Sequence, residues 1–143
     1  MLDYATYDII LDESRKIFTN KELDFAIIEI KPEDKIDSNN YLEIDEIVLK
    51  NDNFSEYLKN GYLLGLNNRK TFYSTFRVRN INKFYLSFYC ETHVGTTGAP
   101  LINSTNNKVI GLNLGVLCKD SQYNVGIIIK YMVKEFLKFY LKK

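Results

Sequence analysis

Residues 95–101, Gly-Thr-Thr-Gly-Ala-Pro-Leu, have the residue types that an exposed nucleophile requires. Gly95 and Gly98 let the backbone turn tightly and present its N–H groups without a Cβ in the way. A hydroxyl held in such a turn can lie beside backbone donors that stabilise an oxyanion. A plain tight turn between two strands is the other interpretation, and the residues alone favour it.

The same stretch resembles the Gly-x-Ser-Gly-x-Pro signature of chymotrypsin/trypsin-like serine proteases, especially the Gly-Ser-Ser-Gly-Ser-Pro form of compact intracellular trypsin-like peptidase domains. Residues 109–115 are similar to the strand that follows it there and lines the primary specificity pocket. The resemblance implies an oxyanion hole made by the N–H groups of Gly95 and Thr97. Thr97 stands where the family has its nucleophilic serine, and its extra methyl restricts χ1 and crowds the attack path.

The other triad positions are only partly represented. Residues 24–30 resemble the family strand Asp-x-Ala-Leu-Leu-x-Leu, so Asp24 maps onto the aspartate that orients the histidine; by itself Asp24 would be a solvated residue at a strand start. The family histidine lies upstream of that aspartate, but the one histidine here is His93, four residues before Thr97. Because the base must approach the hydroxyl from the opposite lobe, we expect His93 to be an exposed loop residue rather than the base.

The resemblance also implies a specificity pocket lined by Asn113, Leu114, Gly115 and Gly126. Glu91, six residues before Thr97, lies where the family places the pocket-floor residue, and a carboxylate there would favour a basic substrate side chain. We expect no metal and no cofactor.

The length and composition of the chain are those of a globular protein. With 143 residues, 45% of them hydrophobic and 26% charged, the chain is expected to be one globular domain. A net charge of +1 gives no general attraction to nucleic acid or to an anionic membrane, so we expect neither as a partner. The N-terminus has no signal-peptide pattern, which predicts a cytoplasmic protein with Cys90 and Cys118 reduced.

Most of the chain has short β-type runs, and only the C-terminal stretch has helical periodicity. Arg77 and Arg79 alternate with apolar residues and are interpreted as a solvated strand face. In residues 130–142 lysines recur every fourth position beside an apolar face, which indicates an amphipathic helix with a solvated side; a membrane-surface helix is the alternative. Strands are expected over residues 7–11, 23–30, 61–66, 71–79, 83–89, 101–103, 108–112 and 123–129.

Together these features predict an all-β fold, a trypsin-like Greek-key double barrel with a truncated first barrel and a C-terminal helix. Residues 1–40 would be the remnant of the first barrel, and residues 41–143 the second barrel plus the helix, all in one compact unit. A few strands cannot close a barrel, so the remnant should have open edges through which the chain could form a homo-oligomer.

Three functional hypotheses follow. The first is a trypsin-like serine-protease homologue that is catalytically inactive as this chain and acts, if at all, as a module binding a peptide or protein. The second is an active serine-type endopeptidase half whose histidine comes from a missing segment or a partner chain. The third is a structural fragment without function.

Overall fold

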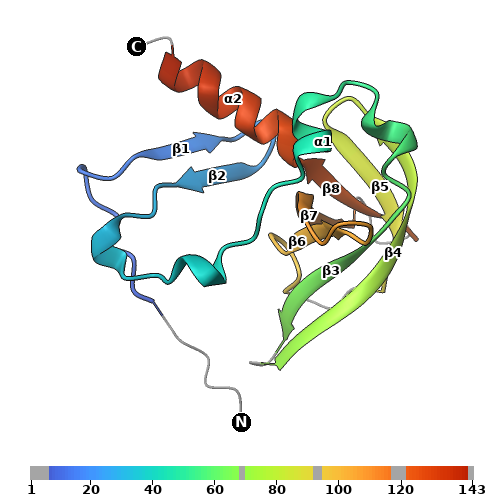
Figure 1. The fold of residues 1–143 in the computed structure, drawn as a ribbon, viewed down its shortest axis with the longest axis horizontal. Coiled ribbons are helices and arrows are strands. Elements are labelled where there is room, and N and C mark those ends of the chain that lie inside the picture. The colour runs from blue at the N-terminus through green and yellow to red at the C-terminus, as the bar shows by residue number, and fades with distance from the viewer. Residues whose placement is uncertain (1–6, 68–69, 92–94, 117–121, 142–143) are drawn as a thin grey trace. The chain divides into compact units, whose positions relative to one another are not determined.

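The structure is a computed structural model that describes residues 7–67, 70–91, 95–116 and 122–141 (Figure 1). Contacts between residues divide the chain into two compact units, Met1–Leu42 and Glu43–Lys143. The first unit holds a two-stranded sheet, and the second holds a closed antiparallel barrel. Each unit is described in turn.

The first unit is built on the hairpin β1 (Ile17–Asn20) and β2 (Phe25–Ile28), in which Ile17 pairs with Ile28. Two 3-10 turns follow, Pro32–Asp34 and Ser38–Asn40. The prediction of a strand over residues 7–11 is wrong. The carbonyl of Ile10 accepts a hydrogen bond from the Arg15 side chain at 2.8 Å instead of from a neighbouring strand.

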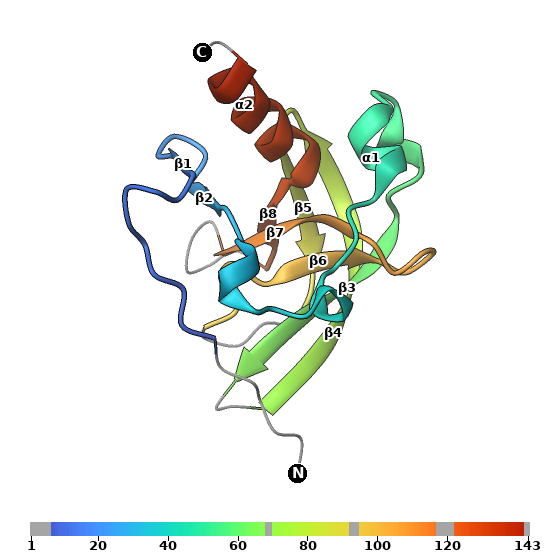
Figure 2. The same ribbon diagram turned by 60° about the vertical axis from the view of Figure 1, so that its left-hand side comes forward.

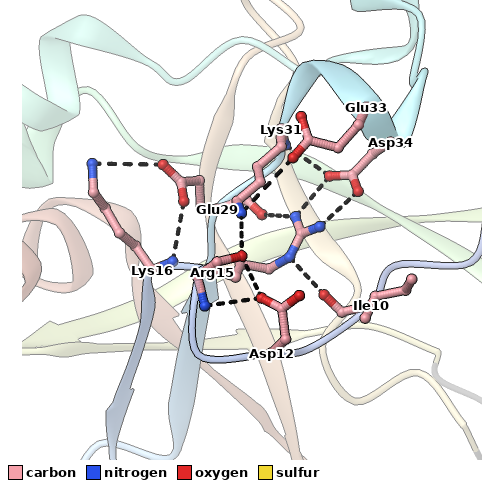
Figure 3. Close-up of polar contacts among 9 residues, drawn as sticks. Ile10, Asp12, Arg15, Lys16, Glu29, Lys31, Glu33 and Asp34 are labelled. Atoms are coloured by element: carbon pink, nitrogen blue, oxygen red, sulfur yellow. Dashed lines mark hydrogen bonds and ion pairs between the residues drawn. The ribbon is translucent and has the colours of Figure 1, made fainter.

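A buried ion pair fastens this unit (Figure 3). Both carboxylate oxygens of Asp34 accept hydrogen bonds of 2.7 Å from the Arg15 guanidinium, and Arg15 also donates to the carbonyl of Glu29 at 2.6 Å. The Lys31 N–H adds a further 2.7 Å bond to Asp34. The Arg15 side chain, followed by the Lys31 N–H, lowers the pKa of Asp34 to about 2. One arginine therefore joins three separate stretches of the unit.

The second unit is a six-stranded barrel with the strand order β3-β4-β5-β8-β7-β6 (Figures 1 and 2). β6 pairs with β3 rather than with β5, so β3 to β6 form a Greek key, and the same pairing closes the barrel. The predicted all-β fold with a nearly complete barrel and a C-terminal helix is confirmed. The strands are β3 (Asn60–Asn67), β4 (Lys70–Asn82), β5 (Tyr85–Tyr89), β6 (Pro100–Asn103), β7 (Val109–Val116) and β8 (Asn124–Ile128).

The turn between β4 and β5 lies later in the chain than predicted. Residues 80–82 were expected to join two strands, but β4 continues through Asn82, and the turn lies at Lys83 and Phe84. Lys83 has a φ of 47°, the left-handed conformation that a tight turn requires. The ladder between β4 and β5 shifts between Val78 and Asn80, which makes Arg79 the extra residue of a β-bulge.

The core of the barrel consists of side chains from alternate strand positions, as the period of two requires. Burying one such side chain contributes about 1.5–3 kcal/mol. The buried cluster also includes residues that precede the first barrel strand. Its members are Val48, Phe54, Leu58, Leu63, Phe76, Leu86, Phe88, Leu101, Ile110 and Ile128.

Two α-helices and the 3-10 turn Phe54–Glu56 accompany the barrel strands in the described part of the second unit. α1 (Glu46–Lys50) is short, and α2 (Ile129–Leu141) contacts α1, β7 and β8 (Figure 1). The prediction of an amphipathic C-terminal helix is confirmed, with Met132 buried and Lys134 exposed. In the part of the chain that the structure describes, no helix has the length and apolar character to cross a membrane.

A buried carboxylate fixes the start of the barrel unit. Asp45 caps α1 by accepting hydrogen bonds from the N–H groups of Ile47 and Val48. Its Oδ2 accepts from Asn103 Nδ2 at 2.9 Å, Asn106 Nδ2 at 3.1 Å and the Tyr57 hydroxyl at 3.2 Å. The network ties α1 to the β6–β7 hairpin.

Candidate active site at the glycine loop

The glycine loop forms a β-turn over residues 96–99. The N–H of Ala99 donates to the carbonyl of Thr96 at 3.1 Å, and Gly98 has a φ of 84°. That value belongs to the third residue of a type II turn, where glycine is required because φ is positive. Thr97 occupies the second position of this turn and is exposed to solvent. The local sequence therefore places Thr97 at the surface of the turn.

The side chain of Asn113, on β7, stabilises this turn through hydrogen bonds. Its Nδ2 donates to the carbonyl of Thr96 at 3.0 Å and to the Thr96 hydroxyl at 3.2 Å. The backbone of Asn113 pairs with the loop as well, accepting from Gly98 N–H at 2.7 Å and donating to Ala99 at 2.9 Å. Both side chains are buried, with 5% of Thr96 and 0% of Asn113 exposed. The glycine loop is thus a rigid part of the barrel.

The sequence pattern did not indicate this support. The resemblance implied a specificity-pocket position for Asn113 and no role for Thr96. The available signal was a lone amide within the otherwise apolar run of residues 109–114. A buried amide in such a run must find hydrogen-bond partners, and the adjacent loop supplies them.

The Thr97 hydroxyl faces the end of β7. A Cβ built on Gly115 would lie 3.6 Å from Thr97 Oγ1. In the described part of the chain, no acceptor is bonded to the N–H of Gly95 or Thr97, and the Thr97 hydroxyl has no hydrogen-bond partner. The loop therefore combines an exposed hydroxyl with two available backbone donors, the elements that could hold an oxyanion.

None of the described residues is hydrogen-bonded to this hydroxyl as a base. His93 lies outside the described residues. Asp24 belongs to the first unit, where it is exposed and ends the β1–β2 turn with a φ of 54°. The structure therefore brings together Gly95, Thr97, Asn113 and Gly115, all within the second unit.

The predicted pocket residues are distributed over several environments. Leu114 and Gly115 line a cavity of about 380 Å³ together with Tyr85, Val116 and Val125. Asn113 is buried under the turn instead.

Two further pocket predictions lie away from that cavity. The side-chain position of Gly126 faces the barrel core, because a Cβ built there would lie 2.4 Å from Leu101 Cδ1. Glu91 is exposed just after β5 and is not among the lining residues. The side chains that surround the cavity are therefore uncharged.

The nearby cysteine has the properties of an inert thiol. Burial raises the pKa of Cys90, and the charge of Glu91 adds to the effect, although a contact with the carbonyl of Ser74 opposes it. A protonated thiol is a poor nucleophile and a poor metal ligand. No three histidine, cysteine or carboxylate side chains of the described residues are close enough to hold a metal ion.

Comparisons with known proteins give weak similarities only. No family model matches the chain. A crystal structure of Rv3671c from M. tuberculosis H37Rv, a serine-to-alanine mutant in an inactive form, aligns with a TM-score of 0.47 and 16% identity, covering 56% of this chain and 46% of that one. The tobacco vein mottling virus protease aligns with a TM-score of 0.40 and 10% identity, covering 49% and 35%. This chain therefore spans less than half of the length of each of these two proteins.

Proposed function

We propose that this chain is a serine-protease-like module that binds an extended peptide and, as this chain, does not hydrolyse it. The observation that carries the proposal is the environment of Thr97. Its hydroxyl is exposed on a rigid turn beside two available N–H groups, and no described residue is placed to remove its proton. Without a base, a hydroxyl stays protonated near neutral pH and attacks a peptide carbonyl poorly.

The binding half of the proposal rests on the continuity between the turn and the neighbouring cavity. Gly115 is close to Thr97 Oγ1 and also lines the 380 Å³ cavity. A peptide carbonyl bound by the N–H groups of Gly95 and Thr97 would place an adjoining side chain near this cavity. The lining by Tyr85, Leu114, Val116 and Val125 favours an apolar side chain.

One observation favours a second candidate function. The free N–H groups of Gly95 and Thr97 retain what an acyl-transfer site needs for its oxyanion. An active endopeptidase half, with its histidine supplied by a missing segment or a partner chain, would use the same groups. The two candidates differ only in whether Thr97 reacts.

A fluorophosphonate probe and a peptide library together test the proposal. We expect Thr97 to stay unlabelled by the probe, and peptides with an apolar residue to bind in fluorescence anisotropy. Val116→Arg should abolish peptide binding because Val116 lines the cavity and is 49% exposed, so the variant can fold. Tyr73→Arg, at a 73% exposed position of β4, is the matched control and should bind normally.

The outcomes separate the candidates. Stoichiometric labelling of Thr97 would establish an active enzyme and overturn the proposal. Absence of binding by any peptide, or equal binding by Val116→Arg, would overturn the binding module.

A further inference from the structure

We propose that Lys59, Arg77 and Arg79 form a binding site for a multiply charged phosphate group. The site lies at the junction of β3 and β4, in a cavity of about 650 Å³ lined by these three cations and by Ser55, Asn60 and Asn80. It uses none of the residues of the glycine loop. The inference is therefore independent of the proposed function.

The backbone brings the cations together. Lys59 immediately precedes β3, and its carbonyl accepts a hydrogen bond from Val78 N–H at 2.8 Å, which places it beside the two arginines. Arg77 and Arg79 flank Val78 on β4 and are both exposed. Lys59, Arg77 and Arg79 all line the same 650 Å³ cavity. The wall of this cavity thus carries three positive charges.

This cluster has no neutralising partner within the described residues. No Asp or Glu lines the 650 Å³ cavity, and Lys59, Arg77 and Arg79 take part in no ion pair there. The lysines around α1 and α2 differ, since Lys130 pairs with Asp52 at 2.7 Å and Lys138 with Glu135 at 2.6 Å. Positive charge on the helices is partly compensated, and positive charge at this cavity is available for a ligand.

Stacking on Tyr123 orients the guanidinium of Arg79 before any ligand binds. The guanidinium lies 3.9 Å from the centre of the Tyr123 ring, and the hydroxyl of that tyrosine is 3.0 Å from the hydroxyl of Tyr89. Such stacking leaves the edge of the guanidinium, with its N–H donors, available for a ligand. Arg79 and Asn80 also line an adjoining cavity of about 260 Å³ that includes Ser87 and Asn82. The arginine can therefore serve a ligand that extends beyond one phosphate.

Charge and chemistry favour phosphate over a single carboxylate. Three cations exceed the one negative charge of a carboxylate, whereas a phosphate carries a charge of about −2 and several acceptor oxygens. Guanidinium groups bind phosphate oxygens in pairs, and the amides of Asn60 and Asn80 add neutral donors. A cavity of 650 Å³ also has the size of a ligand site rather than of an ion site.

Titration calorimetry of the full chain at low salt tests the proposal with three probes: inorganic pyrophosphate, ATP and citrate. We expect pyrophosphate and ATP to bind, with Arg77→Gln or Arg79→Gln each weakening the affinity by about tenfold or more, the usual effect of one charge-assisted hydrogen bond. Lys21→Gln removes an exposed cation of the first unit and is the matched control, which should bind like wild type. ATP bound more tightly than pyrophosphate would show that the adjoining cavity takes the nucleoside.

Citrate distinguishes phosphate recognition from simple charge attraction. It carries several carboxylates and should bind at least tenfold more weakly than pyrophosphate. Equal binding of citrate would overturn the assignment to phosphate. No binding of any probe, or an equal loss in Lys21→Gln, would overturn the site itself.

Discussion

The side-chain amide of Asn113 donates to both oxygens of Thr96, at 3.0 Å to the carbonyl and 3.2 Å to the hydroxyl. A strand residue thereby fixes the loop residue that directly precedes the candidate nucleophile. Since both side chains are buried, no water can easily replace either bond. The orientation of the Thr97 hydroxyl depends on this pair.

We expect Asn113→Ala to lower the free energy of unfolding by about 1–3 kcal/mol, because the buried Thr96 hydroxyl and carbonyl each lose a hydrogen bond from Asn113. Urea denaturation followed by far-ultraviolet circular dichroism measures the change. Asn80→Ala removes an exposed amide of β4 and should change stability by less than about 0.5 kcal/mol. Equal effects of the two variants would contradict the role of Asn113.

The carboxylate of Asp45 should make the barrel sensitive to acid. Burial alone would raise the pKa of Asp45, but the hydrogen bonds from Asn103, the Val48 N–H, Asn106 and Tyr57 outweigh it and hold this pKa below its ordinary 3.8. Because the pKa of Asp45 is lower in the folded state than in the unfolded state, its ionisation stabilises the folded protein at pH values above the unfolded-state pKa. This contribution disappears as the pH falls through the folded-state pKa.

We therefore expect Asp45→Asn to cost about 1–3 kcal/mol at pH 7, since its amide would place a donor against the donors of Asn103 and Asn106. The difference from wild type should shrink below about pH 4. Unfolding by urea across that pH range measures it, with Glu22→Gln, an exposed position, as control. A difference that stays constant down to low pH would show that ionised Asp45 is unimportant.

Two glycines should respond differently to the same substitution. A Cβ on Gly111 would lie 2.2 Å from the carbonyl oxygen of Ile127, so Gly111→Ala must push two strands apart and should cost about 3 kcal/mol. Gly98 has open space around it and a φ of 84°, so Gly98→Ala should cost about 1–2 kcal/mol through backbone strain alone. Thermal unfolding of both variants gives the order, and the reverse order would contradict this account.

The variant Thr97→Ser tests whether catalysis is prevented by the missing serine or by the missing base. A base is commonly worth about two to four orders of magnitude in rate, so we expect Thr97→Ser to stay near background in an ester hydrolysis assay. His93→Ala should change nothing in that variant. Robust hydrolysis by Thr97→Ser that His93→Ala abolishes would identify His93 as the base.

The hairpin of the first unit should promote self-association. Its sheet has two strands, so each strand has an edge without a ladder partner in the described part of the chain, and Ile17 and Ile28 are 38% and 40% exposed. We expect a dimer or larger species by light scattering, which Ile28→Lys should weaken while Leu66→Lys on the barrel does not. A monomer at high concentration would contradict the prediction.

Much of the barrel was predictable because its strands are short apolar runs bounded by turn residues, as at residues 101–103 and 108–112. Residues 7–11 have the same local character, yet they form no strand, since strand formation requires a partner that only the fold provides. Strand β1 was missed because Ile17–Asn20 is too short to show a period.

The site was predictable only where backbone geometry dominates. The glycines at 95 and 98 marked the turn, and their positive φ values agree with that use. The contacts of Asn113 and Asp45 join residues distant in sequence, so neither residue's spacing indicated its partners. The alternation of Arg77 and Arg79 with apolar residues likewise indicated only a solvated strand face, and nothing in the sequence singled out Lys59.

The chain enters the barrel at a fixed point. Glu43 accepts a hydrogen bond from Val109 N–H at 2.8 Å, Asp45 donates one back to the Val109 carbonyl at 2.9 Å, and the Asp45 carboxylate then caps α1. Strand register downstream of this point is set by contacts within the barrel unit itself. We therefore expect a lobe of different length or sequence to be able to precede Glu43 without shifting the barrel, so that residues 43–143 could be fused to another domain as one unit.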